Sequence, residues 1–199
     1  SLRSSILIEC GSENYEKSGK RHYSRGTGFV LDGAGYVLTA KHVGSGFEKG
    51  ECQSQLRAPV IGVQSQLSFK FDLAPQAYSA NLDVMLFQLP TEARWYPEVH
   101  FASPVFGEQL KAYGYPEASR GRTLRVASGI VGEGLADEAG VVASDAITSP
   151  GMSGGPLVNS ANEIVGIIVG AEFDRVTGAP TSYGFLDIDL ALESLGRMT

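Results

Sequence analysis

Apolar and polar residues alternate over many short stretches of the chain, a pattern that predicts β-strands. Phe69, Phe71 and Leu73 alternate with Lys70 and Asp72, as expected for a strand with one buried face. The stretches are bounded by Gly, Pro, Asn and Ser, which favour turns. We expect strands over Ile6–Cys10, Gly26–Leu31, Tyr36–Ala40, Leu67–Leu73, Val84–Leu89, Gln109–Tyr115, Arg122–Val131, Val141–Ala146, Pro156–Val158, Ile164–Ala171 and Ser182–Ile188.

The alternation stops at two places. Pro90, Pro97 and Pro104 interrupt any regular element between residues 90 and 107, so we expect a connector there. The segment Asp187–Leu195 places acidic residues first and apolar residues at helical spacing, which predicts a short amphipathic helix. Periodicity therefore predicts an all-β protein with one helix near its C-terminus.

Composition narrows the possible partners. The chain has 199 residues, 43% hydrophobic and 19% charged, which suits one large or two small globular domains. Its 25 glycines favour a turn-rich β protein. The net charge is −6 and the 16 Lys and Arg residues form no basic stripe, which argues against nucleic acid as a partner. No apolar run approaches the ~20 residues of a membrane-spanning helix.

Neither the two cysteines nor the glycine-rich stretch around residue 27 predicts a bound metal or cofactor. Cys10 and Cys52 can form a disulfide if their strands are neighbours, or stay as two buried thiols, and the sequence leaves both alternatives open. No His, Cys and Asp cluster has the spacing of metal ligands. Gly26-Thr27-Gly28 lacks the Gly-Lys-Ser/Thr sequence of a phosphate loop. We expect no metal and no cofactor.

A glycine-rich turn, Gly151-Met152-Ser153-Gly154-Gly155-Pro156, predicts a serine nucleophile. A serine hydroxyl needs a base to take its proton, and the carbonyl it attacks becomes an oxyanion that needs N–H donors. Small residues let the backbone turn sharply and aim two N–H groups at one point. We expect Gly151 and Ser153 to supply these donors, with Met152 between them.

A base and an orienting carboxylate lie upstream of the turn. His42, in Thr39-Ala40-Lys41-His42-Val43, follows an apolar run, and Asp83, in Asn81-Leu82-Asp83-Val84-Met85-Leu86, opens another. Of the three histidines, His22 lies in a polar loop and His100 in the connector, so His42 is the best candidate base. Ser153, His42 and Asp83 are the residue types of a catalytic triad.

These segments resemble the chymotrypsin-like serine proteases, whose motifs T-A-x-H, D-[IV]-x-L and G-x-S-G-G-P occur here in the same order. The segment around Ser153 is most similar to that of the bacterial high-temperature-requirement stress proteases. The resemblance implies an all-β fold of two six-stranded antiparallel β-barrels with the active site between them and a short C-terminal helix. It implies one protease domain, with a first barrel over 1–89, a connector over 90–107, a second barrel over 108–186 and a helix over 187–199.

The resemblance also implies where substrate binds. The base of the pocket for P1, the residue before the scissile bond, corresponds to Ile147 with its neighbour Thr148. Its walls correspond to Val169-Gly170-Ala171, Tyr183 and Phe185. Because Ile147 stands where proteases that cleave after Arg or Lys have an aspartate, we expect small or medium apolar P1 residues. Many relatives have a serine or threonine near Val169, which supports the triad aspartate.

The resemblance therefore predicts a serine endopeptidase acting on peptides or proteins. One alternative is a protease that cleaves its own chain or a single target. Another is a catalytically weak pseudoprotease that binds peptides. The sequence shows no recognisable signal peptide. Because it has only two cysteines, the bacterial cytoplasm or periplasm fits better than a disulfide-rich secreted setting. The oligomeric state cannot be read from the sequence.

Overall fold

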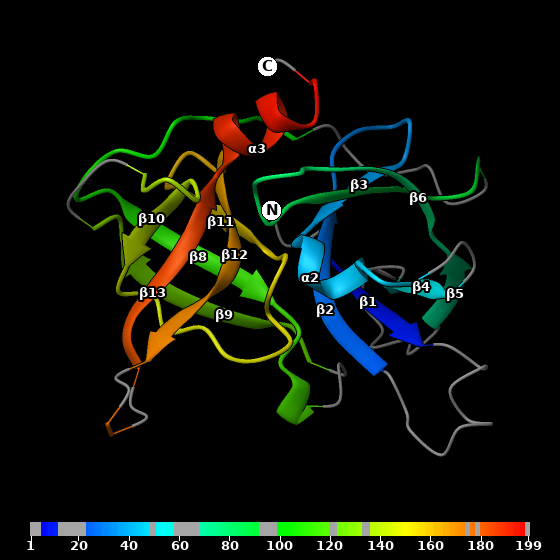
Figure 1. Ribbon diagram of the computed structural model, residues 1–199, viewed down its shortest axis with the longest axis horizontal. Helices are drawn as coiled ribbons and strands as arrows, with labels where there is room; N and C mark the ends of the chain where they lie inside the picture. Colours follow the sequence, from blue (N-terminus) through cyan, green and yellow to red (C-terminus); the bar gives the residue numbers. More distant parts are fainter. Residues whose placement is uncertain are drawn as a thin grey trace, which may run out of the picture.

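The computed structural model describes residues 5–11, 23–47, 51–57, 68–91, 99–119, 123–132, 136–173, 176–177 and 180–197. Figure 1 shows two barrel-like sheets side by side, the first built from the N-terminal half of the chain and the second from the C-terminal half. The elements of the first half are β1 (Ser5–Gly11), β2 (Tyr23–Val30), β3 (Tyr36–Thr39), α2 (Lys41–Gly44), β4 (Cys52–Arg57), β5 (Ser68–Asp72), β6 (Ala74–Tyr78) and β7 (Met85–Gln88). Those of the second half are β8 (Gln109–Gly114), the 3₁₀ turn η2 (Glu117–Ser119), β9 (Arg125–Ile130), β10 (Val141–Ser144), β11 (Pro156–Val158), β12 (Ile164–Phe173), β13 (Pro180–Asp187) and α3 (Ile188–Ser194).

The first sheet is antiparallel, with the strand order β5-β4-β1-β2-β3-β7-β6. Its two edge strands, β5 and β6, are separated by Leu73 alone, so together they form one strand bent at a buried residue. This bent strand pairs with β4 at one end and β7 at the other, which closes the sheet into a barrel. The predicted six-stranded barrel is thus a sheet of seven segments.

The sequence analysis missed β4 and β6, and each has a physical reason. In β4 the buried positions include Ser54, a polar residue that breaks the apolar alternation. In β6, Pro75 lies beside a shift in the register with β7, at the edge of the sheet, where a proline is tolerated. The other predicted strands are present with small shifts at their ends. Some predicted positions lie outside the described residues. They are Leu67, Arg122, the side chains of Phe69 and Lys70, and residues 92–98 of the predicted connector.

The second sheet has six antiparallel strands in the order β10-β13-β12-β11-β8-β9. A bridge between Val131 and Ser144 joins its two edges. The N–H of Gly132 donates to the carbonyl of Ala143 at 2.7 Å, beside that bridge. The closed second barrel confirms the expectation of a six-stranded sheet in this half.

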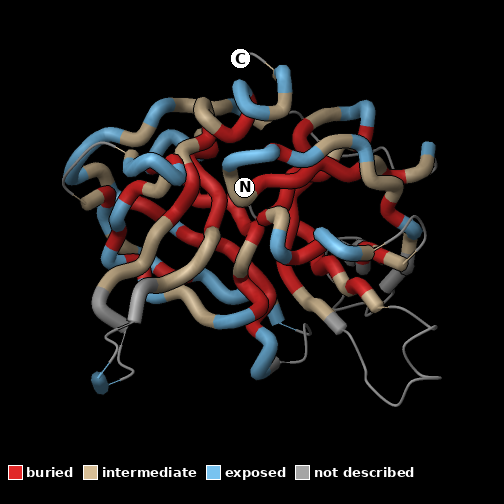
Figure 2. The backbone as a smooth tube through the Cα atoms, in the orientation of Figure 1, coloured by how far each residue is buried: buried red, intermediate tan, exposed pale blue. Residues whose placement is uncertain are grey.

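Buried residues run through both barrels (Figure 2), and the apolar ones form three clusters. One fills the first barrel and one the second, whereas the third combines residues of both halves. The third cluster includes Phe29 and Leu38 of the first barrel with Tyr113 and Ile167 of the second. Helix α3 adds Ile188, Ala191 and Leu192 to the same cluster. The two barrels are therefore joined by a shared apolar interface, which the predicted C-terminal helix helps to cover.

Cys10 and Cys52 face each other on the neighbouring strands β1 and β4 and form a disulfide, which settles the alternatives left open above. Both residues are almost completely buried in the first barrel. The loop closed by the bond contains β2, β3 and α2. The disulfide therefore constrains the segment that carries Thr27 and His42.

Replacing Cys10 and Cys52 together with alanine should reduce the free energy of unfolding by about 2–4 kcal/mol, because the unfolded chain loses a covalent constraint. Urea denaturation of the wild type and of the double variant measures the loss. Adding a reductant should destabilise the wild type and leave the variant unchanged. Equal urea midpoints for all samples would show that the bond contributes nothing to stability.

Candidate active site

His42 lies on α2, a single turn that is separated from β3 by Ala40 alone. Val43 anchors this turn by burying its side chain in the first barrel, where it is 1% exposed. Gly44 lies so close to Met85 and Phe87 that a side chain there would overlap them. These contacts fix the turn against the barrel and leave the His42 imidazole on the surface.

Asp83 lies at the end of a tight loop that leads into β7. The buried Ser79 shapes the loop, since its hydroxyl accepts hydrogen bonds from the N–H groups of Asn81 and Leu82 at 3.3 and 3.0 Å. The Lys41 ammonium, on α2, donates to the carbonyl of Ser79 at 2.9 Å. The loop is therefore tied to the same turn that carries His42.

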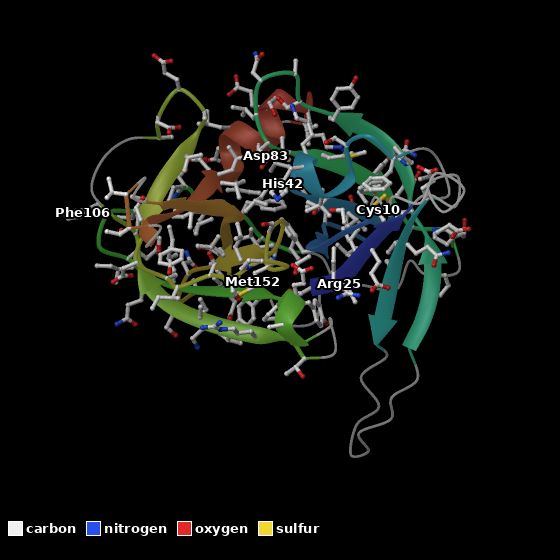
Figure 3. The ribbon with its side chains drawn as sticks, turned by 60° about the horizontal axis from the view of Figure 1, so that its bottom comes forward. Cys10, Arg25, His42, Asp83, Phe106 and Met152 are labelled. Atoms are coloured by element: carbon white, nitrogen blue, oxygen red, sulfur yellow. A yellow bond between two sulfur atoms is a disulfide. The ribbon has the colours of Figure 1, made fainter. Side chains whose placement is uncertain are left out.

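Two hydrogen bonds join His42 to Asp83 (Figure 3). His42 Nδ1 lies 2.6 Å from Asp83 Oδ2, and the His42 backbone N–H donates to Asp83 Oδ1 at 2.9 Å. Within the described part of the chain, the Asp83 carboxylate accepts hydrogen bonds from His42 alone. With Nδ1 turned to the carboxylate, Nε2 is the nitrogen left to exchange a proton with another group.

The pair shifts the pKa of both residues. The hydrogen bond to Asp83 raises the pKa of His42 above 6.5; burial opposes this, and the negative charge of Asp83 reinforces it. Burial by itself would raise the pKa of Asp83, but the hydrogen bond and charge of His42, with a contribution from Lys41, lower it overall. Asp83 is thus held as a carboxylate that stabilises a protonated His42.

Ser153 lies on the second barrel in a turn that packs against the first. Its carbonyl accepts a hydrogen bond from the Thr27 N–H of β2 at 2.8 Å. Gly154 has φ +85°, and a methyl group on it would overlap the Thr27 carbonyl and the Thr39 hydroxyl. That methyl group would also lie 2.8 Å from the backbone nitrogen of Ala40, two residues before His42. Glycine at 154 therefore allows Ser153 to approach the turn that bears His42.

Three hydrogen bonds hold the loop before Ser153. The carbonyl of Pro150 accepts from the Glu117 N–H at 2.8 Å, and that of Gly151 accepts from the Thr27 hydroxyl at 2.9 Å. The Met152 N–H donates to the carbonyl of Ser149 at 3.0 Å. Among the described residues, the N–H groups of Gly151 and Ser153 have no protein acceptor.

The peptide plane between Pro150 and Gly151 has a defined direction. Carbonyl and N–H point in opposite directions across a trans peptide bond, and no cis bond occurs among the described residues. Because the Pro150 carbonyl points to Glu117, the Gly151 N–H points away from it. Gly151 and Ser153 can thus donate to an oxygen, whereas the N–H of Met152 is occupied and its side chain is fully buried in the second barrel.

The predicted substrate-binding residues are only partly brought together. Val169, Gly170, Ala171 and Tyr183 line one cavity of about 430 Å³, together with Asp83. The other lining residues are mainly small or apolar, and they are Asn81, Asp137, Ala139, Val141, Ala143, Ser182, Gly184 and Leu186.

The other predicted residues lie elsewhere. Ile147 and Thr148 do not line this cavity, and Ile147 is 57% exposed. The Phe185 side chain is fully buried in the core of the second barrel, and it does not line the cavity. Of the rival histidines, His100 is exposed in the connector, and His22 lies outside the described residues.

Sequence reasoning missed Thr27 and Lys41. Thr27 contacts the loop before Ser153, and Lys41 contacts the loop before Asp83. The glycines on either side of Thr27 are a signal for close backbone approach, but the sequence analysis used them only to exclude a phosphate loop. Nothing in the spacing of Lys41 distinguishes it from a solvated lysine.

Two further expectations can be compared with the described part of the chain. It contains no group of three or more His, Cys, Asp and Glu residues placed to hold a metal ion. None of its helices is long and apolar enough to cross a membrane.

Comparison with known proteins gives a consistent result. A family profile described as "Trypsin-like peptidase domain" matches residues 26–167. A probable periplasmic serine endoprotease, DegP-like, from Hahella chejuensis is 31% identical over 186 residues, which cover 88% of this chain and 35% of that protein. The serine protease Do-like HtrA of Lactobacillus helveticus is 28% identical over 188 residues, covering 84% of this chain and 41% of that protein. The chain thus spans well under half the length of these relatives.

Solved structures share the fold. The HtrA-type protease AlgW with a tripeptide superposes with a TM-score of 0.75 at 20% identity, over 97% of this chain and 59% of that one. The Rv3671c protease from M. tuberculosis in its active form gives a TM-score of 0.73 at 20% identity, over 100% of this chain and 83% of that one.

Replacing Asp83 with asparagine should lower the pKa of His42, because a neutral amide cannot stabilise the imidazolium while the burial that disfavours it remains. NMR titration of the imidazole C–H signals measures the change. Asp137→Asn is a matched control, since Asp137 lines the same cavity but accepts hydrogen bonds from Ala139 and Val141 instead of His42. If His42 titrated identically in the wild type and in Asp83→Asn, the pair would not govern its protonation.

Proposed function

Because the chain belongs to the trypsin-like peptidase domain family, we propose that it is a serine endopeptidase that uses Ser153, His42 and Asp83. One observation carries the proposal. The His42–Asp83 pair lies beside a turn that presents Ser153 and two N–H groups without protein acceptors. We further propose that the two barrels and helix α3 work as one protease domain, because residues of both barrels are needed to assemble this site.

In the proposed reaction, the Ser153 hydroxyl attacks the carbonyl carbon of the scissile peptide bond while His42 Nε2 takes its proton. The carbonyl oxygen becomes an oxyanion in a tetrahedral intermediate. His42 then returns the proton to the leaving amine, the C–N bond breaks, and an acyl-enzyme remains. Water, activated by His42 in the same way, hydrolyses the ester and restores Ser153.

Asp83 contributes by its charge and its position. The imidazolium formed during the attack is stabilised by the carboxylate 2.6 Å from Nδ1. The second bond, from the His42 backbone N–H, fixes the carboxylate relative to the ring. No hydrogen bond joins Ser153 to His42 in the described chain, and hydrogen bonds between catalytic groups often tighten only in the complex with substrate.

The oxyanion would be stabilised by the N–H groups of Gly151 and Ser153. Both belong to peptide planes that are already held by other hydrogen bonds, so little reorganisation is needed when charge develops. The Pro150 carbonyl, which could otherwise occupy the hole, is bound to the Glu117 N–H. This arrangement supports a competent hole in the resting protein.

The substrate is proposed to bind as an extended strand beside residues Val169–Ala171 of β12, with main-chain hydrogen bonds giving affinity. The mainly small and apolar lining of the cavity formed by these residues and Tyr183 would accept apolar side chains. Ile147, which the resemblance assigns to the base of the P1 pocket, does not line this cavity, and its side chain carries no charge. A preference for small or medium apolar P1 residues follows.

The disulfide indicates the kind of cellular compartment in which the protein works. Disulfides form and persist in oxidising compartments and are rare in the bacterial cytoplasm. The protein from Hahella chejuensis carries the description periplasmic. We therefore propose the periplasm, or another oxidising compartment, in preference to the cytoplasm.

A peptide-binding pseudoprotease is the second candidate. It is favoured by Val169, whose side chain cannot give the Asp83 carboxylate the hydroxyl hydrogen bond that many relatives have. In the described chain, Asp83 depends on His42 for both of its hydrogen bonds. Whether the Ser153 hydroxyl reacts as a nucleophile distinguishes the endopeptidase from the pseudoprotease.

A fluorophosphonate probe should add once to the wild type and not at all to Ser153→Ala, because only an activated serine hydroxyl displaces the leaving group. Intact mass spectrometry gives the number of adducts. Ser160→Ala, which removes an exposed hydroxyl from the turn after β11, should label like the wild type. A folded wild-type protein without any adduct would refute the endopeptidase and favour the binding module.

Cleavage of a peptide library, read by mass spectrometry, should show kcat/KM for small or medium apolar P1 residues at least about tenfold above that for Arg or Lys. The physical reason is that small and aliphatic side chains make up most of the cavity lining. Of its two carboxylates, Asp83 is paired with His42, and Asp137 accepts the N–H groups of Ala139 and Val141. A uniform preference for Arg and Lys at P1 would overturn the assignment of the pocket while leaving the triad in place.

A further inference from the structure

Thr27 lies near the middle of β2 in the first barrel and is completely buried. Its hydroxyl donates to the carbonyl of Gly151 at 2.9 Å and accepts from the N–H of Tyr115 at 2.8 Å. Both of these partners belong to the second barrel. A hydroxyl group of the first barrel is therefore fully hydrogen-bonded by the chain of the second.

The backbone of Thr27 takes part in the same junction. Its N–H donates to the Ser153 carbonyl at 2.8 Å, and its carbonyl accepts from the Thr39 hydroxyl at 2.7 Å. Thr27 thus binds the carbonyls of both residues whose N–H groups we assign to the oxyanion hole. No other residue among those described contacts the two in this way.

Three consecutive peptide planes build the oxyanion loop. The first, Pro150–Gly151, carries the Gly151 N–H, and the third, Met152–Ser153, carries the Ser153 N–H. The carbonyl of the first is held by the Glu117 N–H at 2.8 Å, and that of the third by the Gly155 N–H at 3.0 Å. The middle plane, Gly151–Met152, joins them, and its carbonyl is the one held by the Thr27 hydroxyl.

Gly151 is the residue at which this loop could rotate. It has φ +92° and no side chain to restrict it. Within the described chain, the Thr27 hydroxyl is the only side-chain donor to a carbonyl of residues 150–153. If that donor is lost, the buried Gly151 carbonyl has no partner, and reorienting its peptide becomes favourable.

We propose that Thr27 is a positioning residue that keeps the oxyanion hole open by holding the Gly151–Met152 peptide plane. The inference rests on the proposed function and deepens it. Thr27 touches no reacting atom and acts through Gly151. Because Thr27 belongs to the first barrel, the hole of the second barrel is complete only while the two barrels are docked.

Thr27→Val tests the proposal, since valine keeps the size and branching of threonine and removes its hydroxyl. We expect kcat to fall about tenfold or more, less than the 10²–10³-fold loss typical of deleting an oxyanion donor itself. KM and the pH titration of His42 should stay as in the wild type. Thr27→Ser, which keeps the hydroxyl, should restore kcat.

Ser54→Ala is the control. Ser54 is equally buried in the first barrel, and its hydroxyl donates to the Phe71 carbonyl and not to the oxyanion loop or to Thr27. Both variants lose the hydrogen bond of a buried hydroxyl and should lose stability, measured by thermal unfolding, but only Thr27→Val should lose kcat. An equal loss of kcat in both, or none in Thr27→Val, would overturn the proposal.

A crystal structure of Thr27→Val gives a readout that does not depend on activity. The proposal predicts that the Gly151–Met152 peptide has turned, so that the Met152 N–H no longer donates to the Ser149 carbonyl and the N–H groups of Gly151 and Ser153 no longer point to one position. An unchanged loop would refute the proposal even if the wild type is an active protease. Should the wild type prove inactive, the proposed function fails, but this structure still decides the role of Thr27. If Thr27→Val does not fold, Thr27→Cys, with a weak thiol donor of similar size, replaces it in both comparisons.

Discussion

The contact between the Ser153 turn and strand β2 is the constraint on which the site depends. It brings a second-barrel nucleophile to a first-barrel base, and it requires glycine at 154, where any side chain would overlap Thr27 and Thr39. The turn is held by backbone and hydroxyl hydrogen bonds in a buried junction, where leaving one unmade costs about 1–3 kcal/mol. Thr27 and Thr39 are both completely buried at that junction, and the two barrels also share an apolar cluster.

Different contacts position the groups for proton transfer and the groups that stabilise the oxyanion. On the first barrel, the short turn α2 carries His42 and is tied to the Asp83 loop through Lys41, so base and carboxylate move together. On the second barrel, the oxyanion loop is held among the described residues by uncharged groups, which are the backbone N–H of Glu117 and the hydroxyl of Thr27. Changes in pH therefore act on proton transfer through His42, whereas changes in barrel docking act on the oxyanion hole through Thr27.

The ordered motifs around His42, Asp83 and Ser153 made the family and the two-barrel fold predictable, because the chemistry needs those residue types in fixed local sequences. Strand β4 was not predictable from alternation, since its buried face includes Ser54. The disulfide depended on the register that places Cys10 opposite Cys52, and no local pattern encodes that register. Thr27 was missed for the same reason, because its partners come from a distant part of the chain.

The most direct test of the account is a crystal structure of the protein after reaction with a peptidyl boronic acid, which forms a tetrahedral adduct on an activated serine. The account predicts boron on Ser153 Oγ, with one boronate oxygen accepting hydrogen bonds from the N–H groups of Gly151 and Ser153. The Pro150 carbonyl should still be bound to the Glu117 N–H. An adduct whose oxygens meet neither N–H group, or a Pro150 carbonyl turned into the hole, would contradict it.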